Sequence, residues 1–172
     1  MRMRRFWKTL RWFVMIGTCL FIFAQFFGPA KTNPPLDQAL TLQSNAYLSP
    51  QVASILDRSC NDCHSNSTRW PWYSHVAPVS WFVIDHVNEG RRDMNFSEWG
   101  RYDERRRAGK LKQICQEVKN GAMPLGSYTP LHRGSKLTPE DVKTLCDWAN
   151  AERSRIAQLS LRLPDSRMSD ML

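Results

Sequence analysis

The sequence predicts an all-α domain preceded by one N-terminal transmembrane helix. Three observations lead to this fold class: an uncharged apolar run near the N-terminus, four later stretches with apolar residues at helical spacing, and no convincing strand alternation. The 172 residues leave room for one domain with a hydrophobic core, and the 42% hydrophobic content excludes a disordered chain. Five cysteines are too few for a disulfide-built miniprotein.

The first 30 residues combine a basic tail with a predicted membrane anchor. Residues 1–11 carry five basic side chains and no acidic one, whereas residues 12–30 carry no charge. A helix of that length spans about 28 Å, close to the thickness of a bilayer core. The positive-inside rule places the tail in the cytoplasm and the following domain on the periplasmic side of the inner membrane. Cleavage after Ala30 is the alternative, although the apolar run is longer than that of a signal peptide.

The net charge of +8 belongs largely to this tail. The rest of the chain has 19 basic and 16 acidic residues, a net charge of about +3 that is ordinary for a soluble domain. The charge therefore indicates membrane insertion and not a nucleic-acid partner.

Residues 31–48 form the predicted linker, because KTNPPL at its start favours extended chain and a soluble domain that begins near Asp37. The predicted helical domain follows and covers residues 49–160. The polar residues 161–172 lack helix caps and are expected to form a flexible tail.

The first two predicted helices lie on either side of an aromatic segment. One begins at Ser49-Pro50, where serine caps the helix and proline takes its first position, and it runs into Cys60. The other begins at Pro78 and is expected to end at Gly90. Its apolar face consists of Val79, Phe82, Val83, His86 and Val87.

The last two predicted helices have apolar faces that each contain a cysteine. One covers about 102–120, with Leu111, Ile114, Cys115 and Val118 facing inward and Gly121 at its end. The other is capped at Thr138 and has acids in its first turn. Its apolar residues are Val142, Leu145, Cys146, Ala149 and Trp148.

The segment Cys60-Asn61-Asp62-Cys63-His64 is a C-x-x-C-H motif, which in an exported protein is typical of covalent haem attachment. Two thiols about one helical turn apart can each form a thioether with a vinyl group of haem. The imidazole that follows them can then bind the iron. The sequence therefore predicts one haem c per chain, attached through Cys60 and Cys63, with His64 as an iron ligand.

Three other uses of the motif compete with haem attachment. A zinc site usually needs a second ligand pair at comparable spacing, and the chain has no second C-x-x-C. A thioredoxin-type motif requires a βαβ setting, which the sequence pattern does not predict. A disulfide between Cys60 and Cys63 stays open. The export anchor and the helical domain favour haem.

Met123 is the first candidate for the sixth iron ligand. It lies well after His64, and the proline that follows it favours an extended loop able to reach across a haem. Thioether ligation raises the reduction potential, which suits electron transfer. His86 and His132 are weaker alternatives, His75 is a further loop histidine, and an open sixth position is the remaining alternative.

Four other features have two interpretations each. The aromatic residues between Arg69 and Trp81 either line the haem pocket or pack in the core. Arg69 either pairs with a haem propionate or is solvated. The basic run 105–107 either receives an acidic partner or is a solvated helix face. Cys115 and Cys146 either form a disulfide between the third and fourth helices or stay separate buried thiols.

Several motifs recur in order in a family of exported bacterial haem-binding domains, which this chain resembles. They are KTNPP, CNDCHSNST, PWYSHVAPVSWFVIDHVNEGR, NFSEW, GAMPLGSYTPLH and KLT, and they cover about residues 31–150. The helix that ends in C-x-x-C-H, the later Met-Pro and the capped last helix also resemble class I c-type cytochromes. The resemblance implies a cytochrome c-like fold with haem held by Cys60 and Cys63 and His64 as the proximal ligand.

The expected function is electron transfer by a monohaem protein that residues 12–30 hold in the membrane beside a redox partner protein. This makes the chain an electron carrier and not a catalyst. The alternative is a haem-based sensor, a small-ligand binder or a weak peroxidase, which needs an open sixth position. A structural domain without haem is a third option. No nucleophile–base pair and no Gly-rich phosphate loop points to another catalytic class.

Overall fold

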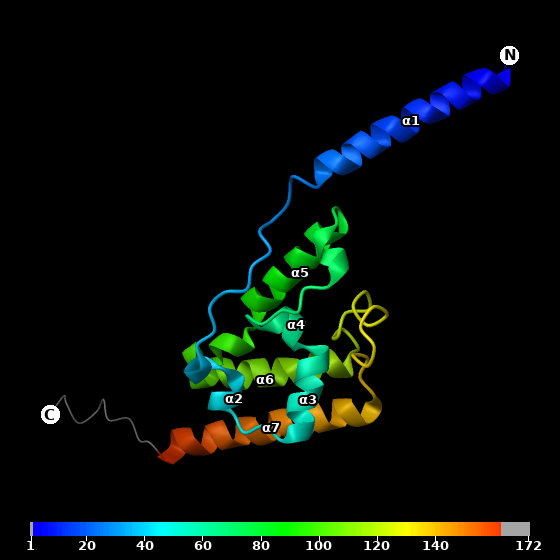
Figure 1. The fold of residues 1–172 in the computed structure, drawn as a ribbon. Helices are drawn as coiled ribbons and strands as arrows, with labels where there is room; N and C mark the ends of the chain where they lie inside the picture. The colour runs from blue at the N-terminus through cyan, green and yellow to red at the C-terminus, as the bar shows by residue number, and fades with distance from the viewer. Residues whose placement is uncertain (1, 163–172) are drawn as a thin grey trace.

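The computed structural model describes residues 2–162, and within this range the chain is helical and contains no strand. This confirms the predicted all-α class. One helix stands apart from a packed domain built by the others (Figure 1). Figure 1 also shows that this separate helix lies at the N-terminus and that extended chain leads from it to the domain.

The separate helix, α1, covers Arg2–Ala24 and is exposed over nearly all of residues 3–24. Its stretch Met3–Ala24 is long and apolar enough to cross a membrane. The helix begins earlier than the predicted anchor 12–30, because the basic residues also adopt helical conformation. It also ends earlier, at Ala24. At the other end, Gln25 Nε2 donates to the carbonyl oxygen of Phe21 at 2.8 Å, and a turn follows.

Residues 31–36 form an extended strap that lies along the domain and is bonded to it. Asn33 Nδ2 donates to the carbonyl oxygen of Thr68 at 2.9 Å. The guanidinium of Arg91 donates to the carbonyl oxygen of Thr32 and to Oδ1 of Asn33, both at 2.8 Å. The predicted linker thus begins as extended chain, but hydrogen bonds hold it in place.

The second half of the predicted linker 31–48 is packed structure. It contains the 3-10 helix η1 (Gln38–Leu40) and the short helix α2 (Leu42–Asn45). Thr41 caps α2 through its hydroxyl, which accepts from the amide of Ser44, and Leu42 is fully buried. The packed part of the chain therefore begins before residue 49.

Helix α3 (Pro50–Ser59) begins as predicted, with the hydroxyl of Ser49 accepting from the amide of Val52 at 3.2 Å. The short helix α4 (Asn61–His64) follows it directly. The aromatic segment then forms the 3-10 helix η2 (Trp72–His75).

Helix α5 (Val79–Asp93) differs from its prediction in two ways. It continues past Gly90, which therefore does not end it. The predicted apolar face is a core face only in part, since Val87 is buried but Phe82 is 53% exposed, and the buried Ile84 is not on the predicted face. Periodicity identifies a set of apolar residues but not the side of the helix that the domain covers.

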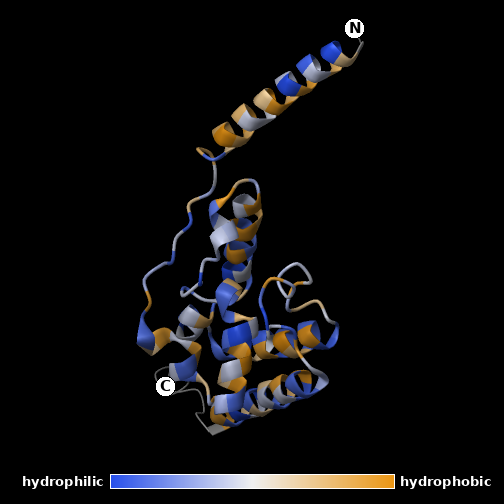
Figure 2. Cartoon of the chain, turned by 45° about the vertical axis from the view of Figure 1, so that its right-hand side comes forward, coloured by the Kyte–Doolittle hydropathy of each residue, from blue (hydrophilic) through white to orange (hydrophobic). Residues whose placement is uncertain are grey.

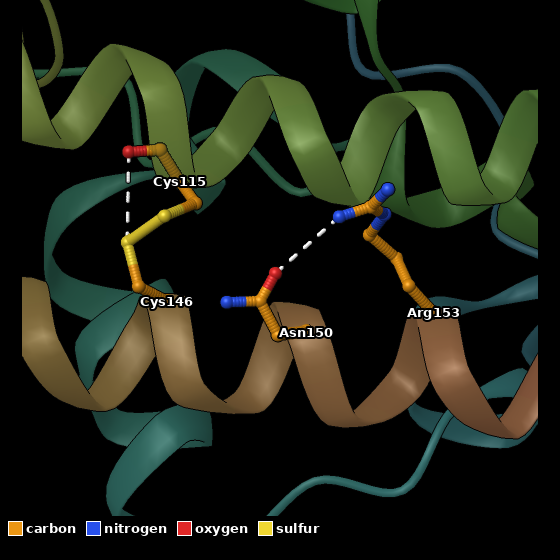
Figure 3. Close-up of a disulfide and its surroundings, with 4 residues drawn as sticks. All are labelled: Cys115, Cys146, Asn150 and Arg153. Atoms are coloured by element: carbon orange, nitrogen blue, oxygen red, sulfur yellow. Dashed lines mark hydrogen bonds between the residues drawn. A yellow bond between two sulfur atoms is a disulfide. The ribbon is translucent and has the colours of Figure 1, made fainter.

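The remaining helices pack against each other and close the domain. They are η3 (Phe96–Arg101), α6 (Glu104–Lys119) and α7 (Pro139–Arg162). Helices α6 and α7 lie side by side (Figure 1), and a disulfide joins Cys115 to Cys146 with a Cα–Cα distance of 4.7 Å (Figure 3). This decides between the two predicted states of these cysteines.

The predicted cap of the last helix is confirmed, because the hydroxyl of Thr138 accepts from the amide of Asp141 at 3.1 Å. Most of the predicted tail 161–172 lies outside the described residues. The largest fully buried apolar side chains of the core come from five elements: Trp99, Leu42, Ile55, Leu56, Leu111 and Leu145.

Candidate functional site

The cysteines of the C-x-x-C-H motif lie where α3 gives way to α4. Cys60 has φ −129° and ψ −41°, outside the helical region, so it interrupts the helix. The amides of Cys63 and His64 both donate to the carbonyl oxygen of Cys60, at 3.2 and 3.0 Å, and this closes one tight turn. Cys60 and Cys63 are free, half-buried thiols, so the structure does not contain the alternative disulfide between them.

Burial makes both thiols harder to deprotonate than an ordinary cysteine. It raises the pKa of Cys60 to about 12, and the charge of Cys63 acts in the same direction. Burial also raises the pKa of Cys63 to about 11, together with the nearby carboxylate of Asp62. Both side chains are therefore protonated thiols at neutral pH.

His64 is buried, and backbone carbonyl groups hold its ring. Its Nδ1–H donates to the carbonyl oxygens of Gly90 and Met94, both at 3.0 Å. Because Nδ1 carries the donated proton, Nε2 keeps the lone pair with which an imidazole binds a metal. The ring also lies 5.9 Å from the ring of Phe96. Residues outside the motif therefore fix both the orientation and the tautomer of His64.

Gly90 allows α5 to approach the motif closely enough for this bond. A Cβ at this position would lie 2.7 Å from the carbonyl oxygen of Cys63 and 3.2 Å from its Cβ. Only a residue without a side chain fits there, so Gly90, inside α5, allows this helix to pack closely against the motif. Sequence reasoning misses this role, although a glycine inside an amphipathic pattern is a signal for such an approach.

Two adjoining cavities of about 270 and 300 Å³ border the motif. Cys60, His64 and Met123 line both of them. Cys63 and His86 line the first cavity, on the side of α5. The structure thus gathers the predicted attachment residues, the predicted proximal ligand and two predicted sixth ligands around one space.

His86 presents one ring nitrogen to its own helix. Its Nδ1 donates to the carbonyl oxygen of Phe82 at 2.8 Å, and the two rings lie 4.0 Å apart. This leaves the lone pair on Nε2, so His86 remains chemically able to bind a metal.

The loop that carries Met123 is tied to α4 by a tyrosine. The hydroxyl of Tyr128 donates to Oδ2 of Asp62 at 2.7 Å, inside the motif itself. The loop begins at Gly121, whose φ of +69° favours glycine. Burial, together with the bond to Asp62, raises the pKa of Tyr128 far above its ordinary value. Sequence reasoning misses Tyr128, since nothing local marks this long-range bond.

The other two candidate histidines have different surroundings. His132 Nδ1 contacts the carbonyl oxygen of Tyr128 at 2.9 Å, and its Nε2 contacts the hydroxyl of Tyr73 at 3.3 Å. Both of its ring nitrogens are therefore engaged by protein groups. His75 lies at the surface beside the amino group of Lys31. The structure does not bring either of them to the cavities that His64 lines.

Arg69 pairs with carboxylates of the chain itself. Its Nε donates to Oδ1 of Asp62 at 3.0 Å, and its Nη1 donates to Oδ2 of Asp57 at 3.1 Å. The hydrogen bond to Asp62 is the main reason that the pKa of Arg69 is raised. The Arg69 side chain is nevertheless 58% exposed, which agrees with the predicted solvated state, and its pairing with a haem propionate stays a prediction.

The aromatic residues between Arg69 and Trp81 mostly do not line the cavities beside the C-x-x-C-H motif. Tyr73 lines a third cavity, of about 130 Å³, next to Cys63 and Tyr128. Trp72 is 79% exposed. Trp81 borders a surface hollow together with the end of α1. Of the predicted aromatic segment only Tyr73 lines this cavity, where Phe82 and Tyr128 accompany it, and the tryptophans do not.

Comparison with known proteins gives one match. The family model described as "Haem-binding domain" matches residues 19–151, which include the motif, both cavities and the disulfide. No curated protein and no solved structure matches the chain.

Proposed function

Because the chain belongs to the haem-binding domain family, we propose that it is a membrane-anchored, monohaem protein of the c-type cytochrome kind that transfers electrons. Bound haem would supply an iron that exchanges one electron between two oxidation states. The chain would supply the attachment groups, the iron ligands and the closed surroundings of the site.

One observation carries this proposal. Two free thiols lie one turn apart beside a histidine whose Nδ1 is bonded to backbone carbonyl groups. All three side chains border the same cavity, and the family to which the chain belongs binds haem. This donor set fits a covalently held haem, with Cys60 and Cys63 as thioether attachments and His64 as the proximal ligand.

Met123 is the proposed sixth ligand. It lines both cavities that His64 lines, and it lies on a loop tied to the motif through Tyr128. A thioether ligand raises the reduction potential, which suits electron transfer. His86 lines only one of these cavities and is the second choice.

A pyridine haemochrome assay on the denatured full chain tests covalent attachment. The proposal expects haem to stay with the chain after acid–acetone extraction, and the Cys60→Ser and Cys63→Ser variants to retain it less well. Cys19→Ser is the matched control, since Cys19 is an exposed thiol of α1 far from the site. Complete extraction of haem from the wild type would overturn covalent attachment.

A second measurement separates electron transfer from ligand sensing. The reduced wild type should show a low-spin spectrum and bind carbon monoxide only with displacement of a protein ligand. Immediate binding of carbon monoxide at an open position would instead favour a sensor or small-ligand binder.

We further propose that α1 is an uncleaved anchor in the inner membrane, with its basic end in the cytoplasm and the domain in the periplasm. The length and apolar composition of α1 and the basic residues at its start support this orientation. Protease added to spheroplasts should digest the domain, and resistance to it would place the domain in the cytoplasm.

A further inference from the structure

The end of the domain nearest to α1 is unusually apolar and aromatic. Residues 70–84 contain five aromatic side chains and no Asp, Glu, Lys or Arg. They form η2 and the first part of α5, and we call them the aromatic tip. Four of its large side chains are exposed: Trp72 at 79%, Phe82 at 53%, Val79 at 46% and Trp81 at 36%.

The aromatic tip is bonded to the chain that leaves α1. Gln25 uses both ends of its amide, since Oε1 accepts from the amide of Ala77 at 2.9 Å and Nε2 lies 3.3 Å from the Ala77 carbonyl oxygen. Trp81 Nε1 donates to the carbonyl oxygen of Phe27 at 2.6 Å. A Cβ on Gly28 would lie 2.8 Å from the same indole nitrogen. The tip therefore lies directly against the end of α1.

The arrangement of the helices agrees with these contacts. The first turns of α5 and the loop before it lie nearest to the end of α1 (Figure 1). Figure 2 shows hydrophobic colour at this end of the domain. Helices α6 and α7 lie toward the opposite end (Figure 1).

A lysine side chain lies beside the aromatic tip. Lys31, the first charged residue after α1, contacts His75 of η2. Lys31 Nζ also lies 6.0 Å from the ring of Trp70. Tryptophan rings next to a lysine are the combination that membrane–water interfaces favour, because the rings are amphipathic and the amino group reaches the phosphates.

We propose that the aromatic tip docks into the headgroup region of the same bilayer that α1 spans, so that the domain lies on the membrane surface. This inference rests on the proposed membrane anchoring of α1. The occupant is lipid because the tip is bonded to residues 25–28, where the chain leaves the apolar helix. Because the end of α1 would lie at the membrane surface, a tip bonded there places the exposed ring of Trp72 against the headgroups, whereas Val79 and Phe82 line the cavity beside Cys63.

Photo-crosslinking in vesicles tests the proposal with the full chain. A benzophenone amino acid replaces Trp72, and the protein is reconstituted into vesicles of phosphatidylcholine and phosphatidylglycerol that contain an alkyne-labelled lipid. Tyr47 is the matched control position. It is an aromatic residue of similar exposure, 75%, whose carbonyl oxygen accepts from Trp148 of α7, at the other end of the domain.

The proposal expects lipid adducts at position 72 in severalfold excess over position 47. Equal labelling at the two positions, or adducts at position 72 with protein only, would overturn it. Carbonate extraction of the same vesicles is a separate readout for the anchor. A chain that resists extraction but shows no lipid adduct at position 72 contradicts the docking alone, whereas a chain that is extracted contradicts the anchoring itself.

Discussion

An alanine at position 90 should loosen the contact between α4 and α5 that holds His64. Its Cβ would lie 2.7 Å from the carbonyl oxygen of Cys63, a backbone atom that cannot rotate away. To go from 2.7 Å to the 3.4 Å of ordinary contact, the two backbones must separate by about 0.7 Å. The bond from His64 Nδ1 to the Gly90 carbonyl oxygen already measures 3.0 Å, so this separation would break it.

Two opposing effects set the size of the change. Alanine is favoured over glycine inside a helix by about 1 kcal/mol. Overpacking of a tight contact costs about 1–3 kcal/mol, and the loss of a buried hydrogen bond costs about 1 kcal/mol more. Gly90→Ala should therefore lower the free energy of unfolding by about 1–3 kcal/mol, in spite of its better helix propensity.

Gly109→Ala is the matched control for this prediction. Gly109 lies inside α6, and a Cβ at this position would meet no atom within 4 Å, so only the helix propensity acts there. This variant should gain up to about 1 kcal/mol. Denaturant unfolding of the full chain in detergent micelles, followed by circular dichroism, measures both variants. A Gly90→Ala protein as stable as the wild type or more stable would refute the close-approach argument.

Three further predictions concern other parts of the chain. Met123→Ala should lower the reduction potential of the haem-loaded protein in a redox titration, and an unchanged potential would exclude Met123 as the sixth ligand. Replacing Cys115 and Cys146 together by alanine should lower the free energy of unfolding by about 4 kcal/mol, because the disulfide closes a loop of 31 residues; calorimetry measures this loss, and no change would count against a formed disulfide. Burial raises the pKa of Asp141, but bonds from Thr138 and Arg58 outweigh it and hold that pKa below its ordinary value. The charged form thus stabilises the fold at neutral pH, and this contribution is lost as the pH falls through the lowered pKa. Asp141→Asn should show a flatter acid limb in unfolding curves, and an unaltered limb would argue against the pairing.

Features that depend on neighbouring residues could be predicted from the sequence. Ser49 and Thr138 cap their helices as predicted, since each cap bonds to an amide three residues away. The spacing of the C-x-x-C-H motif likewise identifies its cysteines and histidine as candidates, and their attachment to haem stays a prediction. These signals fix where helices begin and which residues are candidates for the site.

Features that depend on distant residues could not be predicted in the same way. Tyr128 bonds to Asp62 across 66 residues, and Leu42 is buried by elements that follow it along the chain. The apolar residues of α5 obey helical periodicity, but the period does not say which side the domain covers. The sequence leaves the pairing of Cys115 with Cys146 open, because only the packed helices determine the distance between the two Cα atoms.

The strap of residues 31–36 limits how the domain can move relative to α1. A free segment of this length would let the domain swing and rotate over distances of up to about 20 Å. Bonds from Arg91 and to Thr68 remove most of that freedom. With α1 in a membrane, the domain would diffuse in two dimensions at a fixed height and with one side always turned outward. A partner would then meet the site of His64 by lateral encounter within the membrane plane, and its own docking surface must lie at that same height.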